Sequence, residues 1–248
     1  MEPRNKTLVV GGTGHVGTAI CRQLRQAGHA VGFTYCHKHD KAQALSAELN
    51  APCQALDLEA HVTIAPAVRS ITERLGGVDG LVVSSGLATA HQKDGAPVVP
   101  HWDEIEPTAF ARMLSVNVLG VFLACQAAAQ IMKTNQAGRM VLIGSIDGVK
   151  PVPSPADYAC CKAALVGLTQ SLSKDLGPLG ILVNLIAPGI LDGGIARLLN
   201  AELLAEYLKH STLKRVGTPD EIARWAVFLA GPENTYLTGQ TVILDGGL

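Results

Sequence analysis

The sequence predicts an α/β fold with a doubly wound, seven-stranded parallel sheet and helices on both of its faces. Three observations lead to this fold class. Short apolar runs alternate with longer helical patterns from one end of the chain to the other. The runs are almost continuously apolar, which is typical of parallel strands covered on both faces. A glycine-rich turn joins the first run to the first helical pattern.

Seven apolar runs are expected to form the strands, and six helical patterns lie between them. The expected strands are residues 7–10, 30–35, 52–56, 79–84, 139–144, 181–187 and 241–244. The expected helices are residues 15–27, 39–49, 61–75, 107–133, 155–177 and 219–230. Strands and helices that alternate in this order imply parallel strands joined by helical crossovers.

Length, composition and charge fit a single domain, residues 1–248. With 48% apolar and 17% charged residues, the 248-residue chain can bury a large core. A net charge of −1 provides no basic excess for nucleic acid. The first residues lack the apolar stretch of a signal peptide, and no segment has the ~18 uninterrupted apolar residues of a membrane helix. We therefore expect a cytoplasmic protein without nucleic-acid or membrane partners.

The six cysteines predict no metal site. None forms a C-x-x-C pair, and Cys160 and Cys161 have no His or Cys partner at zinc spacing. We interpret the cysteines as small thiols in a reducing compartment.

Two long connections interrupt the alternation of strands and helices. They comprise about residues 87–106 and 190–214, and the second is expected to contain one or two helices. Both follow strands, so both are expected at the carboxyl edge of the sheet, where open α/β folds bind ligands. We expect them to surround the substrate.

The glycine-rich turn in residues 8–17, L-V-V-G-G-T-G-H-V-G, predicts a dinucleotide site. Glycines let the backbone approach a pyrophosphate, and the start of the following helix supplies N–H groups and partial positive charge. A tight turn without a ligand is the alternative. The expected contacts in the turn are Gly11, Thr13, Gly14, His15, Val16 and Gly17.

Three polar residues suggest carbonyl chemistry. Tyr158 and Lys162 are four residues apart and share one face of a helix, and Ser145 follows the apolar run that ends at Gly144. A phenol, an ammonium and a hydroxyl can together polarise and protonate a carbonyl oxygen. The Lys162 ammonium is expected to lower the pKa of Tyr158.

Together these motifs resemble the short-chain dehydrogenase/reductase family over nearly the whole chain. The resemblance rests on the glycine turn, Asp57, Gly86, Asn117, Ser145, the Y-x-x-x-K of Tyr158 and Lys162, Asn184, Pro188-Gly189 and the tail 238–247. Residues 213–223, L-K-R-V-G-T-P-D-E-I-A, are most similar to the β-ketoacyl-acyl-carrier-protein reductase branch. The resemblance implies a single-domain Rossmann fold and reduction of a ketone.

The resemblance also implies catalytic roles. Tyr158 would donate the proton, Ser145 would hydrogen-bond the carbonyl oxygen, and Lys162 would hold the ribose of the cofactor. Asn117 would hold a water molecule that links Lys162 to solvent; a residue that caps or bends its helix is the alternative. Asp147 stands where many relatives have a small or apolar residue, and either contact with substrate or a surface position is open.

Further cofactor contacts are implied by position. They are Tyr35, His37, Lys38, Asp57, Leu58, Ser85, Gly86, Pro188, Gly189 and Ile190, together with Tyr158 and Lys162. No carboxylate follows the second expected strand, where one would bind a ribose 2′-hydroxyl and repel a 2′-phosphate. We therefore expect NADPH rather than NADH, with Lys38 and His37 near the phosphate; a solvated turn is the alternative. Asp57 would contact adenine or cap a helix.

Several positions depart from the family pattern. Val10 and His15 replace a threonine and a glycine of the usual turn, V-S-S-G at residues 83–86 replaces N-A-A-G, and the stretch 192–194 replaces a threonine. Gln136 and Leu179 stand where reductases of acyl-carrier-protein substrates commonly have basic residues.

The expected substrate is a small-molecule or carrier-bound acyl ketone. It would be a β-ketoacyl thioester linked to acyl carrier protein or CoA, of fatty-acid or of polyketide or polyene type. An acyl carrier protein could dock through Lys133, Arg139 or Lys174. An NAD-dependent secondary-alcohol dehydrogenase and a non-catalytic nucleotide-binding scaffold are the alternatives.

The resemblance implies a homo-oligomer, either a dimer or a tetramer. The expected helices 107–133 and 155–177 carry small residues that would pair across a two-fold axis. These are Ala127, Ala128, Ala163 and Ala164. Packing of the same residues against the sheet is the alternative.

Overall fold

A parallel sheet of seven strands forms the centre of the protein. The computed structural model describes residues 5–89, 91–94, 96–97, 100–193 and 201–248. The strands are β1 (Lys6–Val10), β2 (Ala30–Tyr35), β3 (Cys53–Ala55), β4 (Gly80–Val83), β7 (Gly138–Ile143), β8 (Ile181–Pro188) and β9 (Thr241–Leu244). Their order is β3-β2-β1-β4-β7-β8-β9, and every neighbouring pair is parallel. The predicted doubly wound sheet is confirmed.

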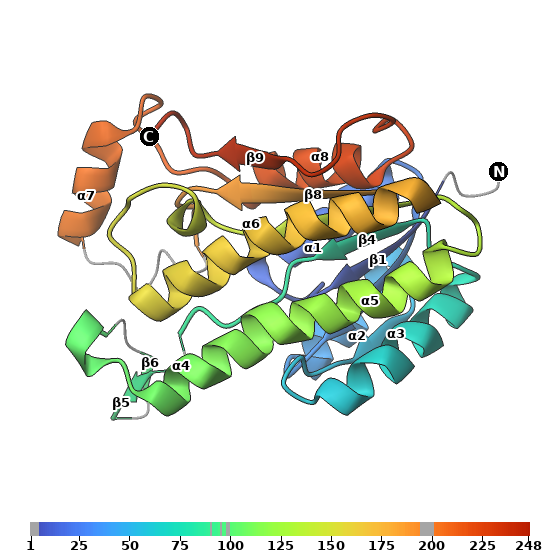
Figure 1. The fold of residues 1–248 in the computed structure, drawn as a ribbon, viewed down its shortest axis with the longest axis horizontal. Coiled ribbons are helices and arrows are strands. Elements are labelled where there is room, and N and C mark those ends of the chain that lie inside the picture. The colour runs from blue at the N-terminus through green and yellow to red at the C-terminus, as the bar shows by residue number, and fades with distance from the viewer. Residues whose placement is uncertain (1–4, 90, 95, 98–99, 194–200) are drawn as a thin grey trace.

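Helices cover both faces of the sheet (Figure 1). They are α1 (His15–Gln26), α2 (His39–Leu49), α3 (His61–Leu75), α4 (Pro107–Leu114), α5 (Val121–Met132), α6 (Ala156–Leu176), α7 (Ala201–His210) and α8 (Pro219–Ala230). In Figure 1, α3, α5 and α6 lie on the face turned toward the viewer, and α1, α2 and α8 lie behind the sheet.

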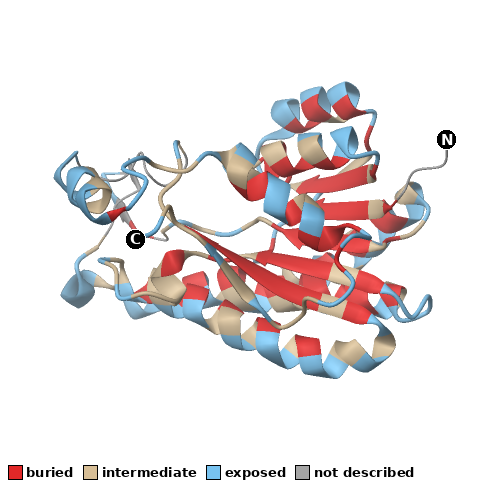
Figure 2. Cartoon of the chain, turned by 90° about the horizontal axis from the view of Figure 1, so that it is seen from above, coloured by how far each residue is buried: buried red, intermediate tan, exposed pale blue. Residues whose placement is uncertain are grey.

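The strands divide their side chains between two cores. Leu8 and Val10 of β1 belong to the core under α3, α5 and α6, whereas Val9 belongs to the core under α1, α2 and α8. Successive side chains of a strand point to opposite faces, so a strand covered on both sides has to be apolar throughout. Figure 2 shows the buried residues concentrated in the strands and along the inner sides of the helices.

The helix expected at residues 107–133 contains a π-helical segment, η2 (Ser115–Gly120), between α4 and α5. A Cβ at Gly120 would lie 2.6 Å from the carbonyl oxygen of Leu58, so the helix passes close to the segment after β3. Among the described helices, only Pro107–Met132 has the length and mean hydropathy that could cross a membrane. In this fold it packs against α3 and α6.

Both long connections lie at the carboxyl edge of the sheet, toward which the arrows of β8 and β9 point in Figure 1. The first contains a small antiparallel hairpin, β5 (Gln92–Lys93) and β6 (Ala96–Pro97), and a 3₁₀ turn, η1 (Trp102–Glu104). The sequence did not predict this hairpin. The second contains α7, and residues 194–200 of this connection lie outside the described part of the chain.

Candidate active site

A cavity of about 260 Å³ opens at the carboxyl edge, where β1, β4, β7 and β8 end. The strand order reverses between β1 and β4, which is the place where doubly wound sheets bind ligands. The predicted residues that line the cavity are Gly14, His15, Val16, Ser85, Gly86, Ser145, Tyr158, Lys162, Pro188 and Gly189. These come from four separate strand–helix junctions, so the fold assembles one site from residues distant in sequence.

Other predicted residues do not line this cavity. They are Gly11, Thr13, Gly17, Tyr35, His37, Lys38, Asp57, Leu58, Asn117 and Ile190. Seven lining residues were not predicted, namely Ser84, Leu87, Ala88, Ile143, Gly144, Leu191 and Gly193. Ser84, Leu87, Gly144 and Leu191 directly adjoin predicted positions, and Ala88 and Gly193 lie in the two connections expected to surround the substrate, so neighbourhood in sequence was the available signal.

Helix α6 presents Tyr158 and Lys162 on one side, one turn apart. The Lys162 ammonium lies 5.4 Å from the centre of the Tyr158 ring and donates to the carbonyl of Ile143 at 3.4 Å. Lys162 is buried between the helix and the end of β7. The predicted pairing of these two side chains is therefore present in the structure.

Burial changes the pKa values of both groups. It lowers the pKa of Lys162 to about 8, against the opposing influence of Cys161 and Asp147. Burial, followed by the negative charge of Asp147, raises the pKa of Tyr158, while a hydrogen bond with Ser145 acts in the other direction. Burial and Asp147 therefore outweigh any lowering by the Lys162 ammonium, and the expectation that Lys162 lowers the pKa of Tyr158 stays a prediction.

Asn117 lies within the π-helical segment η2 and binds the loop after β4. Its Oδ1 accepts from the N–H of Leu87 at 2.7 Å, and its Nδ2 donates to the Leu87 carbonyl at 3.1 Å. A Cβ at Gly86 would collide with Asn117 Oδ1. Asn117 thus positions Gly86 and Leu87, which line the cavity. Its role in holding a water molecule stays a prediction.

Ser145 begins the 3₁₀ turn η3 (Ile146–Gly148) and hydrogen-bonds Asp147. Its hydroxyl donates to Asp147 Oδ2, and the Asp147 N–H donates back to Ser145 Oγ at 3.4 Å. Asp147 is partly buried. Asp147 is therefore not on the open surface, and its contact with substrate, the other position that the sequence left open, stays a prediction.

The turn between β1 and α1 brings backbone close to the cavity. Gly11 has a φ of +87°, which favours glycine, and a Cβ at Gly17 would overlap the carbonyl oxygen of Gly11. The Thr34 side chain accepts from the Gly11 N–H at 3.1 Å and its carbonyl accepts from the Gly12 N–H at 2.8 Å. In the described structure no side chain caps the first turn of α1, so its N–H groups can bind a pyrophosphate. The turn fits a dinucleotide.

A basic residue that the sequence reasoning missed lies beside this turn. Lys41, in the first turn of α2, donates to the carbonyl of Thr13 at 2.9 Å. Burial lowers its pKa, and the nearby positive charges of Lys38 and Arg22 lower it further. The basic character of residues 37–41 was the available signal. Lys41 is exposed, and this hydrogen bond holds its ammonium against the glycine turn.

The other predicted residues at the adenosine end have different roles. The Tyr35 hydroxyl hydrogen-bonds His39 Nδ1 at 2.9 Å. Asp57 is exposed, and its carboxylate accepts from the Glu59 N–H at 2.9 Å, so it closes a turn before α3. Leu58 is buried in the core.

Two contacts connect the long connections to the site. His15 Nε2 hydrogen-bonds the carbonyl of Asp192, so the residue that replaces a glycine reaches across to the segment after β8. His91 Nε2 lies 3.0 Å from the carboxylate of Asp157, with side chains 7% and 2% exposed. The sequence reasoning missed this buried pair, which holds the 87–106 connection against the residue before Tyr158.

A parallel sheet with a glycine-rich turn at its switch point, and a tyrosine, lysine and serine around the adjoining cavity, defines a nucleotide-dependent oxidoreductase. The chain matches, over residues 13–248, the family described as enoyl-(acyl carrier protein) reductase. The protein belongs to the short-chain dehydrogenase/reductase family. The resemblance inferred from the motifs is thereby confirmed.

Curated relatives of this chain include reductases of acyl-carrier-protein substrates. The 3-oxoacyl-[acyl-carrier-protein] reductase MabA of Mycobacterium tuberculosis is 31% identical over 241 residues, which cover 97% of this chain and 91% of MabA. The 3-oxoacyl-[acyl-carrier-protein] reductase FabG of Staphylococcus aureus is 29% identical over 253 residues, covering 100% of this chain and 99% of FabG. The similarity to this branch is therefore confirmed.

Solved structures show the same fold. A short-chain dehydrogenase/reductase from Serratia marcescens is 33% identical with a TM-score of 0.87, covering 99% of this chain and 98% of its own. A gluconate 5-dehydrogenase from Burkholderia cenocepacia, in complex with NADP and tartrate, is 28% identical with a TM-score of 0.90, covering 99% and 95%.

Proposed function

We propose that this protein reduces a ketone with NADPH and that Tyr158 donates the proton. The observation that carries the proposal is the position of Ser145, Tyr158 and Lys162 around one cavity, beside a glycine turn that fits a dinucleotide. The proposed substrate is a β-ketoacyl thioester linked to acyl carrier protein or CoA, of fatty-acid or of polyketide or polyene type. Two relatives named above as 3-oxoacyl-[acyl-carrier-protein] reductases support this substrate class.

The side chains would share the proton chemistry. Bound NADPH would supply the hydride. The Tyr158 phenol is protonated near neutral pH and so has a proton to donate to a carbonyl oxygen. The Lys162 ammonium, with a pKa of about 8, keeps most of its charge at pH 7 and is proposed to hold the ribose. We propose that Asn117 holds the water that connects Lys162 to solvent.

NADPH is proposed over NADH because of the charges at the adenosine end. The positive charge of Lys38 is close enough to lower the pKa of Lys41, and Lys41 contacts the glycine turn. No carboxylate follows β2 between Tyr35 and His39. A ribose 2′-phosphate would meet positive charge there, with His37 as a further contact.

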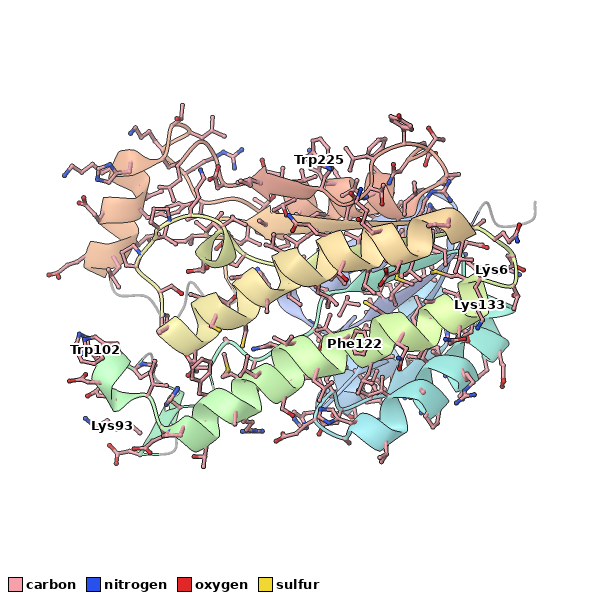
Figure 3. All side chains as sticks on the ribbon, in the orientation of Figure 1. Lys6, Lys93, Trp102, Phe122, Lys133 and Trp225 are labelled. Carbon is pink, nitrogen blue, oxygen red and sulfur yellow. The ribbon has the colours of Figure 1, made fainter. Side chains whose placement is uncertain are left out.

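A carrier-bound substrate would have to approach the carboxyl edge. Lys133 lies at the opposite end of the molecule from Trp102 and Lys93 (Figure 3), and β7, which contains Arg139, begins at that opposite edge. Arg139 also donates to the carbonyl of Asn234 at 2.8 Å. Lys133 and Arg139 therefore lie away from the cavity of their own subunit, and Lys174 is in the last turn of α6, whereas Tyr158 is in its first. Docking of a carrier through these three residues stays a prediction, and exposed Lys93 is a better placed cation.

We also propose a cytoplasmic homo-oligomer, a dimer or a tetramer. Trp225 and Phe228 of α8 are 43% and 42% exposed, and their rings contact each other edge to face, so they form an apolar patch suited to a second copy. Of the alanines expected to pair, Ala127 and Ala128 are buried in the core, as the alternative stated, whereas Ala163 is exposed.

The proposed reaction is tested with a panel of β-ketoacyl thioesters, free and bound to acyl carrier protein, with NADPH oxidation as readout. Tyr158→Phe is expected to lower turnover by about 10²- to 10⁴-fold, because the proton donor is lost. Tyr236→Phe, at a side chain 94% exposed, is the matched control and should keep full turnover. Full turnover in Tyr158→Phe would refute the mechanism.

Oxidation of a secondary alcohol with NAD is a second candidate. The similarity to a gluconate 5-dehydrogenase structure favours including hydroxy acids and polyols in the panel. Oxidation of one of them with NAD, together with inactivity on every β-ketoacyl thioester, would favour this candidate.

A further inference from the structure

A buried aspartate stands directly before Tyr158 in the first turn of α6. Asp157 is 1% exposed, and its Oδ1 accepts from the N–H of Tyr158 at 2.8 Å. An ionised carboxylate loses its hydration when it is buried, so both of its oxygens need hydrogen-bond donors. The Tyr158 N–H supplies one donor, and the other comes from a different segment of the chain.

His91, on the 87–106 connection, supplies this second donor. Its Nε2 lies 3.0 Å from Asp157 Oδ2, 66 positions away in the sequence, and its side chain is also buried. A carboxylate only accepts, so the ring nitrogen that faces it carries the proton. The N–H of His91 donates to Thr89 Oγ1 at 3.0 Å, which fixes the backbone from which the ring extends. The contact thus joins the connection to the helix that carries Tyr158.

The same connection is fixed at a second point, at Leu87. Both main-chain groups of Leu87 are bound by the Asn117 side chain of η2. Leu87 and Ala88 line the cavity that Tyr158 also lines. These two residues, the substrate wall, are therefore held between one anchor on η2 and one anchor on α6.

A second histidine–aspartate pair on the connection is built differently. His101 Nδ1 lies 2.5 Å from Asp103 Oδ1, two positions away, and the side chains are 67% and 57% exposed. Such a pair closes its own turn and is screened by solvent. Lys93, between the two histidines, is exposed at the edge of the molecule (Figure 3). The contact of His91 with Asp157 is thus directed inward, whereas these neighbouring charges face water.

Stability alone does not account for a buried pair at this place. Apolar side chains of similar volume often contribute as much stability as a buried ion pair, or more. What the pair adds is geometry, because a shift between its two segments leaves a charge buried without its partner. Here the two segments are the connection that carries the substrate wall and the first turn of α6.

We propose that His91 and Asp157 are positioning residues that hold the substrate wall at a fixed distance from Tyr158 and thereby select among acyl chains by size. Neither residue lines the cavity, so both act through the wall and Tyr158. The cavity of about 260 Å³ is small for a ligand pocket, so a fixed wall favours a short acyl chain and a released wall admits a longer one. The selection rests on the proposed function, whereas the fixed wall does not.

The fixed wall is tested by amide hydrogen exchange, which needs no substrate. In His91→Ala, the Leu87 and Ala88 amides are expected to exchange on the order of tenfold faster, because one of two anchors is lost. His91→Gln keeps an N–H donor at a similar reach and should restore slow exchange. His101→Ala, which removes the exposed pair, is the matched control and should change neither amide. Unchanged exchange in His91→Ala would overturn the proposal.

The selection is tested with acetoacetyl-CoA and 3-oxodecanoyl-CoA, with NADPH oxidation as readout. In His91→Ala, the ratio of kcat/KM for the short over the long chain is expected to fall about tenfold, mainly through a higher KM for the short chain. A general loss of folded protein would lower kcat for both chains alike and leave this ratio unchanged. His91→Gln should restore the ratio, and His101→Ala should keep it.

The outcomes separate the selection from the proposed function. An unchanged ratio in His91→Ala would refute the selection. Inactivity of the wild type on both thioesters would refute the selection together with the proposed substrate, while hydrogen exchange would still decide whether His91 and Asp157 fix the wall.

A double variant separates positioning from stability. His91→Ala leaves the Asp157 carboxylate buried without its partner. His91→Ala combined with Asp157→Asn removes the buried charge and keeps an acceptor for the Tyr158 N–H. This double variant is expected to regain most of the lost resistance to denaturant, but not the chain-length ratio. Recovery of the ratio together with stability would show that the pair acts on stability alone.

Discussion

The two sides of the active-site cavity are built in different ways. On the cofactor side, main chain packs on main chain: a Cβ at Gly11 would lie 3.0 Å from the carbonyl oxygen of Ser84, and one at Gly17 would overlap Gly11. On the substrate side, side chains make the contacts, as in the pair of His91 with Asp157. The cofactor side tolerates only glycine where its main-chain segments come closest. The packing of the substrate side depends instead on which side chains are present.

This difference predicts where the protein can vary. Contacts between main-chain atoms leave no room for a side chain. The cofactor side should therefore be alike in all members of the family that bind the same cofactor. Contacts between side chains can change one at a time, so the substrate side is where specificity can differ. Variants on the two sides should therefore fail differently, and three predictions test this.

The largest effect is expected from Gly17→Ala on the cofactor side. The added carbon would overlap the Gly11 carbonyl oxygen, so the turn has to shift and cofactor affinity should fall on the order of 100-fold. Gly167→Ala is the control, because a Cβ there meets nothing within 4 Å, and it should bind cofactor normally. Cofactor titration followed by fluorescence measures both, and normal affinity in Gly17→Ala would contradict the main-chain account.

On the substrate side, His91→Ala is expected to lower the free energy of unfolding by about 2 kcal/mol, because it leaves the Asp157 carboxylate buried without its partner. Cofactor affinity should stay within about twofold, which separates the two sides. His101→Ala is the matched control: its pair with Asp103 is 67% and 57% exposed and should contribute less than about 0.5 kcal/mol. Chemical denaturation measures both variants. Equal losses in the free energy of unfolding would show that the buried pair stabilises the protein no more than the exposed pair.

The smallest effect is expected from Lys41→Ala. Here a side chain supports the main chain of the glycine turn, so the variant tests a side-chain contact on the cofactor side. The dissociation constant for NADPH should rise about tenfold, since a positive charge proposed to face the 2′-phosphate is lost, while that for NADH changes little. Lys209→Ala, at an exposed lysine of α7, serves as the control. A similar loss for both cofactors would assign Lys41 to the shape of the turn rather than to the phosphate.

The sequence by itself determined the sheet and the cofactor side, because both depend on local pattern. Continuous apolar runs specify strands covered on both faces, and the spacing of Tyr158 and Lys162 places them together on any helix. Glycines at close approaches can be recognised because no other residue fits them.

Only the tertiary structure decided the contacts between segments that are distant in sequence. The pairing of His91 with Asp157, the reach of Lys41 to Thr13 and the hydrogen bonds from Asn117 to Leu87 all join residues at least 28 positions apart. Even the nearby bond from Ser145 to Asp147 depends on how η3 packs on α6. Side-chain direction and charge at such points follow from packing, which sequence periodicity does not record.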